Sequence, residues 1–311
     1  MGEQILISEV GPRDGLQSLD VTLDFETIRD WIAAEAAAGV EEIEVGSFVS
    51  PKLLPQMRHT ARLVEAARGL PGLRVAVLVP NLRGAAAAIA AGAQKLSIPV
   101  SASETHSRRN VNRSHAQMIE EARAIRARLD ALPAAERPHF EAGLSTAFGC
   151  SLEGEVPLAT LVDLAERLVA AGVEELCLSD TTGYADPAAV RARVKAVQAA
   201  IGAERLTGLH LHNTRGLGLA NVVAGLEVGI TTFDASLAGL GGCPAAPGAS
   251  GNIVTEDLAF MLESMGYDTG IDLAALTEVR KILRRALPEE PLYGFLPEAG
   301  LPLGWRKPAA A

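Results

Sequence analysis

The chain has 311 residues, 48% of them hydrophobic and 21% charged, which is enough for one large domain or two ordinary ones and argues against disorder. The formal net charge of −10 disfavours nucleic acid or an anionic membrane surface as the main partner. An odd and sparse set of three cysteines excludes a disulfide scaffold and suits a reducing compartment.

The first residues, MGEQILISEVGPRDG, enter a strand pattern at once. They show neither a charged region before a long apolar run nor an Arg-rich amphipathic leader, so we expect no signal or transit peptide. No apolar run approaches the ~18 residues that a membrane span needs. The predicted compartment is therefore the cytoplasm.

Short runs rich in β-branched residues alternate with amphipathic segments rich in Ala, Leu and Arg. Strands are expected at residues 5–10, 41–48, 73–80, 95–100, 139–148, 175–180, 206–213 and 232–239. Helices are expected near residues 24–38, 57–69, 83–92, 114–130, 157–171, 187–200, 216–228 and 253–265. Residues that favour helix ends flank several of these segments, namely Asp24, Ser114, Asp186, Gly39, Gly92, Gly172 and Gly229.

Eight β/α units over roughly 265 residues match the size of a TIM (β/α)8 barrel, which is about 250 residues. A doubly wound open sheet is the competing architecture, but it gathers its ligand at one switch point. Here polar residues follow several strands. We therefore predict a catalytic barrel over residues 1–268. Residues 269–311 are expected to add a helix near 272–286 and a Pro-rich tail, which packs on the outside of the barrel or across its mouth.

The active site of a TIM barrel lies where its strands end, so the residues at those ends are the candidates. After the first strand, the turn GPRDG presents Arg13 and Asp14, with Gln17 close behind. Glu44 lies within the second strand at a position expected to face inward, and Asp180 ends the sixth. Each residue alone also has a simpler explanation: a surface ion pair, an outward-facing glutamate or a turn cap.

His210 and His212 lie two residues apart at the end of the seventh strand, so both imidazoles point to the same face. The alternative to metal ligation is one packed and one exposed histidine, and the spacing at a strand end favours ligation. With a carboxylate from Asp14 and the amide oxygen of Asn252, the candidate ligands form a mixed nitrogen and oxygen set. Such a set favours Mg²⁺ or Mn²⁺ over zinc.

The stretch SLAGLGGCPAAPGASGN, residues 236–252, holds five glycines, two prolines and Cys243. The glycines allow this loop to fold closely over a ligand, and Glu256 follows in the next predicted helix. Cys150 and Cys177 have the surroundings of small structural residues. Cys243 is therefore the candidate reactive thiol.

These residues, in this order, resemble the 3-hydroxy-3-methylglutaryl-CoA (HMG-CoA) lyase family of metal-dependent DRE-TIM lyases and acyl transferases. The resemblance covers about residues 5–270. It rests on VGPRDGLQ, VGSFVSPKLLPQM, VPNLRG, NVN, LSDTTG, HLHNTRG and AGLGGCPAAPGASGNIVTEDLAFML. The last motif is long and highly specific.

The resemblance implies a role for each matching residue. Four of them match the ligands of a divalent metal: Asp14, His210, His212 and Asn252. Arg13 matches the arginine that stabilises an enolate, and Cys243 matches the cysteine of a mobile catalytic loop. Three acidic residues match groups that support the site: Glu44, Asp180 and Glu256.

The implied reaction is a retro-Claisen cleavage of HMG-CoA to acetoacetate and acetyl-CoA. A metal would lower the pKa of the tertiary hydroxyl, and a base, either Asp14 or a water molecule, would take its proton. Arg13 would stabilise the enolate as it forms, and Cys243 would protonate the enolate carbon or relay that proton. The resemblance also implies a homodimer and a place in leucine degradation and ketone-body formation.

Some residues depart from the family pattern. Asn213 stands in place of an aspartate, Arg215 and Ala245 in place of aromatic residues, and SIPVSASETHSRRNVN differs from the usual FGAASE. We expect all of these to flank the acyl group. A related 3-hydroxy-3-carboxymethyl acyl-CoA is therefore an open alternative to HMG-CoA.

The segment SRRNVNRS, residues 107–114, holds three arginines in an acidic protein. Arginine binds phosphate with two parallel hydrogen bonds, so Arg108, Arg109 and Asn110 are candidates to hold the phosphates of CoA. The alternative is a solvated loop before a helix.

Two other functions remain open from the sequence. A Claisen condensing enzyme of the isopropylmalate, homocitrate or citramalate synthase type shares the RDG turn and the HxH strand, but it lacks the cysteine loop. A non-catalytic CoA-binding barrel would be favoured by the loss of a metal ligand, yet all four candidates are present.

Overall fold

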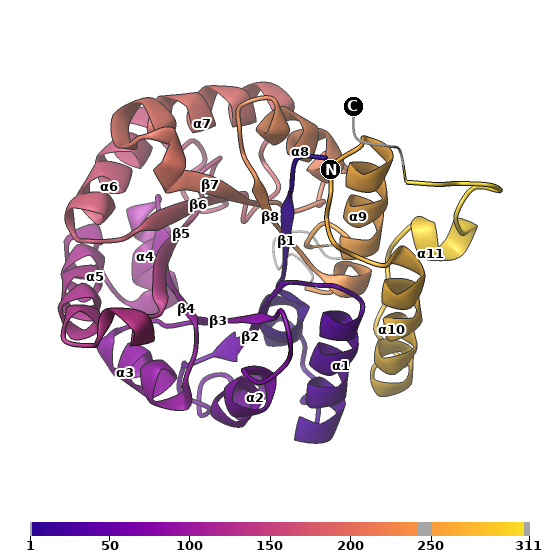
Figure 1. The fold of residues 1–311 in the computed structure, drawn as a ribbon. Helices are drawn as coiled ribbons and strands as arrows, with labels where there is room; N and C mark the ends of the chain where they lie inside the picture. The colour runs from indigo at the N-terminus through magenta and orange to yellow at the C-terminus, as the bar shows by residue number, and fades with distance from the viewer. Residues whose placement is uncertain (1, 242–250, 308–311) are drawn as a thin grey trace.

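The computed structural model describes residues 2–241 and 251–307, and its centre is a closed barrel of eight parallel strands (Figure 1). The barrel closes because β1 pairs with both β2 and β8. The strands are β1 (Leu6–Glu9), β2 (Glu42–Ser47), β3 (Arg74–Leu78), β4 (Lys95–Ser101), β5 (His139–Ser145), β6 (Glu175–Ser179), β7 (Leu206–His210) and β8 (Thr232–Ala235). The predicted (β/α)8 barrel is confirmed, and the open sheet is excluded.

Helices form a ring around the barrel (Figure 1). They are α1 (Phe25–Ala37), α2 (Thr60–Ala67), α3 (Leu82–Ala91), α4 (Glu104–Val111), α5 (His115–Asp130), α6 (Leu158–Ala170), α7 (Pro187–Ile201), α8 (Gly218–Leu226), α9 (Thr255–Ser264), α10 (Leu273–Ala286) and α11 (Leu296–Ala299). A π-helical turn, η1 (Gly11–Gly15), and four short 3₁₀ segments, η2 (Pro55–Met57), η3 (Ala134–Glu136), η4 (Ala203–Arg205) and η5 (Leu237–Gly239), complete the elements.

The predicted helix ends are confirmed by their local geometry. Asp24 accepts a hydrogen bond from the backbone N–H of Thr27 at 2.7 Å, and Ser114 forms a reciprocal capping box with Gln117. The four glycines expected to stop helices all have positive φ, between 83° and 96°, as expected where a helix reverses into a turn: Gly39, Gly92, Gly172 and Gly229.

Two short helices were not predicted, α4 and α11. No helix was expected over residues 104–111, but they form α4, which begins after Ser103 and ends at Asn112 in the left-handed conformation (φ 53°). The Ser103 hydroxyl accepts the N–H of His106 at 3.0 Å, and Glu104 pairs with Arg108 one turn later at 3.1 Å. These local contacts stabilise a helix whose sequence has little apolar periodicity.

The interior of the barrel is polar. Outward-facing residues such as Ile43, Leu96 and Phe140 are buried under the helices, whereas alternate residues of the strands line a cavity of about 560 Å³. Deep in this cavity, the ammonium group of Lys95 pairs with Glu42 at 2.9 Å and with Glu141 at 2.8 Å. The buried cation is therefore compensated from two neighbouring strands, as a charge in such a position requires.

The C-terminal segment packs on the outside of the barrel. Helix α10 lies against α1 and α9, and α11 lies against α9 (Figure 1). Further along, the Trp305 ring contacts Phe260, and Lys307 pairs with Glu263 and Asp268, each at 2.7 Å. Of the two predicted placements for this segment, the outer surface is the one found for the residues up to 307.

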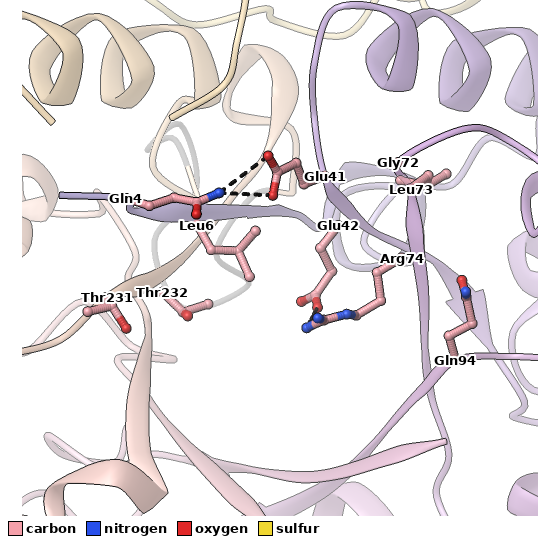
Figure 2. A pocket seen from close by; sticks show the side chains of 10 residues that line it. All are labelled: Gln4, Leu6, Glu41, Glu42, Gly72, Leu73, Arg74, Gln94, Thr231 and Thr232. Atoms are coloured by element: carbon pink, nitrogen blue, oxygen red, sulfur yellow. Dashed lines mark hydrogen bonds and ion pairs between the residues drawn. The ribbon is translucent and has the colours of Figure 1, made fainter. Parts of the chain in front are cut away.

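A second hollow lies at the opposite end of the barrel from the strand C-termini. Its volume is about 470 Å³, and its wall includes Gln4, Glu41 and Arg74 (Figure 2). The Gln4 side chain donates to the Glu41 carboxylate across it (Figure 2). None of the predicted catalytic or metal-binding residues within the described ranges lines it. No helix in the described ranges is long and apolar enough to cross a membrane.

Candidate active site

The turn after β1 aims Arg13 and Asp14 into the mouth of the barrel. Its conformation depends on Gly11, where a Cβ atom would lie 2.5 Å from the Glu9 carboxylate and 2.8 Å from the Trp31 ring. The Nε atom of Arg13 donates to Glu44 at 2.5 Å, and its Nη1 atom donates to Asp14, also at 2.5 Å. The predicted group Arg13, Asp14 and Glu44 is thus one ion-pair network.

The end of β7 brings the two histidines together as predicted. The Nε2 atoms of His210 and His212 lie 3.0 Å apart. The Nδ1 atom of His210 lies 3.0 Å from a carboxylate oxygen of Asp234 on β8. When Nδ1 carries the proton of that hydrogen bond, Nε2 is left as a free lone pair directed at the same point as His212.

Asn252 reaches the same point from the far side of the glycine-rich stretch. Its backbone forms a bridge with His212, which places it beside the end of β7. Its amide nitrogen donates to Asp14 at 2.8 Å and to the carbonyl of Leu240 at 3.3 Å. Its side-chain oxygen is buried and has no hydrogen-bond partner among the residues that the structure describes. A buried acceptor without a partner is costly unless a ligand completes it.

These observations fit a divalent cation. Ligand atoms of Asp14, His210 and His212 all lie within 4.8 Å of one another. The orphaned oxygen of Asn252 supplies a fourth donor of the type that Mg²⁺ and Mn²⁺ accept, together with imidazole and carboxylate.

The pKa shifts of Asp14 and His212 favour ligation by an ionised carboxylate and a neutral imidazole. Burial alone would raise the pKa of Asp14, but Arg13 and the two histidines hold it well below its usual range. Burial and the neighbouring His210 lower the pKa of His212 to about 4. Burial likewise opposes protonation of His210, yet its bond to Asp234 raises its pKa overall. Asp14 and His212 are therefore ready to bind a cation at neutral pH.

The cavity also includes several of the other predicted residues. Gln17, Glu44 and Asn110 line it. Burial raises the pKa of Glu44 even though Arg13 opposes the shift. Arg108 and Arg109 are exposed on α4, the helix that also carries Asn110 at the cavity wall. Cys243 lies outside the described residues.

Two predicted residues lie behind the cavity wall rather than in it. Asp180 uses one oxygen to accept the N–H groups of Tyr184 and Ala185, at 2.8 and 3.1 Å, and its other oxygen is buried with no partner in the described part of the chain. Burial raises the pKa of Asp180 to about 6. Glu256 is fully buried in α9 and pairs with Arg280.

Two of the unusual residues, Asn213 and Arg215, turn away from the cavity. Asn213 accepts the N–H of Gly218 at 3.0 Å and so fixes the start of α8. Arg215 donates to the carbonyls of Thr182 and Gly183, at 3.0 and 2.9 Å, and lies over the Tyr184 ring. Neither lines the cavity in the described part of the chain. Ala245 lies outside the described residues.

The strand-four stretch does reach the cavity. Ser97, Pro99 and His106 line it, and His106 is fixed by the Ser101 hydroxyl at 2.7 Å from its Nδ1. Burial and the nearby Arg109 lower the pKa of His106, which keeps its ring neutral. Of the departures in the described chain, this stretch is the one that lines the cavity.

Three site residues were not predicted: Asp234, His106 and Lys95. Asp234 carried a usable signal. It is an acidic residue inside the predicted strand at residues 232–239, where side chains alternate between the interior and the exterior of the barrel. The partners of Lys95 lie on other strands, far away in the sequence, so spacing along the chain does not reveal them.

The barrel and its cluster of two imidazoles, a carboxylate and an amide oxygen define a metal-dependent (β/α)8 enzyme with its site at the strand C-termini. The chain belongs to the HMGL-like family, whose model matches residues 4–283.

The relatives cover nearly the whole chain. The hydroxymethylglutaryl-CoA lyase YngG of Bacillus subtilis is 40% identical over 300 residues, covering 94% of this chain and 98% of that protein. A 3-hydroxy-3-isohexenylglutaryl-CoA/hydroxymethylglutaryl-CoA lyase of Pseudomonas aeruginosa is 38% identical over 279 residues, covering 89% and 90%. The HMG-CoA lyase structure from Acinetobacter baumannii, in complex with coenzyme A and 3-methylmalate, has a TM-score of 0.89 at 39% identity and covers 97% of each chain.

Proposed function

We propose that the protein is a divalent-metal-dependent carbon–carbon lyase that cleaves HMG-CoA, or a closely related 3-hydroxy-3-carboxymethyl acyl-CoA, to acetyl-CoA and a 3-oxo acid such as acetoacetate. One observation carries this proposal: Asp14, His210 and His212 converge beside Arg13 in one cavity, and Asn252 is hydrogen-bonded to Asp14. The lyases to which the chain is similar give the reaction class. A condensing enzyme is not favoured by any of these relatives.

The cation, Mg²⁺ or Mn²⁺, would be held by those four residues and would supply the positive charge that lowers the pKa of the substrate's tertiary hydroxyl. Asp14 acts as a ligand in this arrangement rather than as the base. Its low pKa makes its carboxylate a weak proton acceptor. Of the two bases left open by the sequence, a water molecule is therefore favoured.

Arg13 is the group placed to stabilise the enolate. Its Nε and Nη1 atoms are engaged by Glu44 and Asp14, and within the described residues its Nη2 atom has no hydrogen-bond partner. The two carboxylates therefore hold the guanidinium at a fixed angle while one N–H edge stays available to the oxyanion. Glu44 is thereby a positioning residue for Arg13.

Cys243 is the proposed proton donor to the departing enolate carbon, directly or through a relay. The step balances because the hydroxyl gives up one proton and the enolate carbon gains one as the C2–C3 bond breaks. Closing of the glycine-rich loop would exclude bulk water from this step.

Acyl-CoA is the proposed ligand, and α4 is the proposed handle for its phosphates. Arg108 and Arg109 are exposed on that helix, and Asn110 lines the cavity. This arrangement would leave the thioester at the mouth and the CoA nucleotide on the outer surface. A homodimer and a cytoplasmic location stay predictions from the sequence.

The experiment that tests the function is a mass-spectrometric screen of 3-hydroxyacyl-CoAs with Mg²⁺ or Mn²⁺. HMG-CoA and its analogues with longer 3-substituents are compared, with acetyl-CoA plus 2-oxo acids as the condensation arm. We expect cleavage of at least one 3-carboxymethyl substrate and its loss in His212→Ala. Condensation without cleavage, or no turnover with either metal, would reject the proposal.

A further inference from the structure

The C-terminal segment reaches the base of the glycine-rich stretch through one buried arginine. Arg280 projects from α10 and is 4% exposed. Its Nη1 atom donates to Glu256 at 2.6 Å and to the carbonyl of Tyr293 at 2.7 Å. Its Nη2 atom lies 3.4 Å from the carbonyl of Leu292. Arg280 therefore joins α9 to the chain that follows α10.

Two of the residues that Arg280 contacts, Glu256 and Tyr293, also form hydrogen bonds with Ala238. The Ala238 N–H donates to the second oxygen of Glu256 at 3.0 Å. The Tyr293 N–H donates to the Ala238 carbonyl at 2.9 Å. Ala238 has a φ of 60°, a conformation that costs free energy for a residue with a side chain. The surrounding hydrogen bonds hold it there, and Arg280 fixes the groups that make them.

Ala238 is two residues from a contact of the metal site. The Leu240 carbonyl accepts the side-chain amide of Asn252 at 3.3 Å, and the same amide donates to Asp14 at 2.8 Å. These bonds orient the Asn252 amide so that its oxygen is left free. The turn at Ala238 sets the position of Leu240, and the Leu240 carbonyl in turn orients the Asn252 side chain.

We propose that Arg280 is a positioning residue for the metal site. Through Glu256 and Tyr293 it fixes the left-handed turn at Ala238, and through Leu240 that turn orients the Asn252 side chain. The C-terminal extension thereby contributes to a site on the other side of α9. The effect on catalysis rests on the proposed cleavage reaction, whereas the effect on metal affinity rests only on the proposed metal site.

The test begins with Arg280→Met, which keeps the aliphatic volume and removes the donors. Three quantities are measured: amide hydrogen exchange at Ala238, Mn²⁺ affinity of the metal-stripped protein by calorimetry, and kcat and KM with the acyl-CoA. The control is Arg284→Met, an exposed arginine on the same helix.

We expect faster exchange at Ala238, a rise of about five- to tenfold in the Mn²⁺ dissociation constant, and a comparable fall in kcat with a nearly unchanged KM. A purely structural role would lower the melting temperature without moving affinity or the balance of kcat and KM. Arg284→Met should stay within about twofold on every readout. Wild-type exchange and Mn²⁺ affinity in folded Arg280→Met would overturn the proposal.

The single variant leaves the Glu256 carboxylate buried without its cation and so is at risk of misfolding. The double variant Glu256→Leu/Arg280→Met replaces the pair by apolar groups, which is commonly tolerated, and still removes the acceptor of the Ala238 N–H. We expect the same changes in exchange and affinity, and wild-type values there would equally overturn the proposal. Failure of wild-type protein to cleave acyl-CoA would reject the proposed function alone.

Discussion

Asp234→Asn should weaken metal binding although Asp234 is not itself a ligand. The Asp234 carboxylate lies 3.0 Å from Nδ1 of His210, on the opposite side of the ring from the Nε2 that faces His212. It therefore selects the tautomer with a free lone pair at Nε2. An asparagine keeps the shape but loses the charge, and its amide is also able to present an N–H to the ring and so favour the wrong tautomer.

The expected magnitude follows from the bond that changes. A hydrogen bond to a charged group contributes about 1.5–3 kcal/mol, and a neutral one about 1 kcal/mol. The difference of roughly 0.5–2 kcal/mol corresponds to a loss of about 2- to 30-fold in affinity, within reach of the 10- to 100-fold typical of such partners. We expect a rise of about tenfold in the dissociation constant.

The assay is calorimetric titration of Mn²⁺ into metal-stripped protein at pH 8, well above the pKa of about 4 of His212. Asp163→Asn, which alters an exposed ion pair with Arg167 on α6, is the matched control and should bind as wild type does. A dissociation constant for Asp234→Asn within twofold of the wild-type value would refute the argument that Asp234 sets the tautomer of His210.

Three further predictions concern single side chains. His212→Ala should abolish measurable Mn²⁺ binding by calorimetry, and unchanged binding would remove His212 from the ligands. Cys243→Ala should leave Mn²⁺ and acyl-CoA binding largely intact while it lowers kcat by orders of magnitude, and near-normal turnover would exclude the thiol from the mechanism. Burial raises the pKa of Glu9 from 4.5 to about 8. Between these two pH values the folded protein keeps a proton that the unfolded chain loses. The free energy of unfolding therefore falls by up to ~1.4 kcal/mol for each unit that the pH rises. Glu9→Gln, which is always neutral, should show a smaller fall in its urea midpoint from pH 5.5 to 7.5, and an unchanged fall would contradict the assignment.

The fold was predictable because its signals are local. Each strand has a compact apolar run, and several helices begin at a capping residue whose effect depends on its immediate neighbours. The shared direction of the two histidines was predictable for the same reason, because residues two apart on a strand point to the same face. The helix α4 was missed for the opposite reason. Its stability depends on Ser103 and on a Glu104–Arg108 pair rather than on an apolar stripe.

The contacts that complete the site were not predictable from spacing. Asn252 and Asp14 are far apart in the sequence, and only the resemblance to a family joined them before the barrel brought them to 2.8 Å. Asn213 and Arg215 show the limit of a motif, because proximity to the metal histidines suggested a role at the acyl group. Their side chains turn instead to α8 and to the turn after β6.

The charge balance of the cavity gives an independent reason for a divalent cation. Five carboxylic acids line it, Asp14, Glu42, Glu44, Glu141 and Asp234, against two permanent cations, Arg13 and Lys95. Burial raises the pKa of Glu141 to about 7, so one of the five is partly neutral near physiological pH.

The remaining acids still exceed the cations, and an excess of buried negative charge is unfavourable unless a cation or a proton offsets it. A divalent ion bound near Asp14 would offset this excess of negative charge in the folded protein but not in the unfolded chain. Ion binding should therefore stabilise the fold as well as the enolate: at a hundredfold excess of free metal over its dissociation constant, one site adds about 2.7 kcal/mol to the free energy of unfolding.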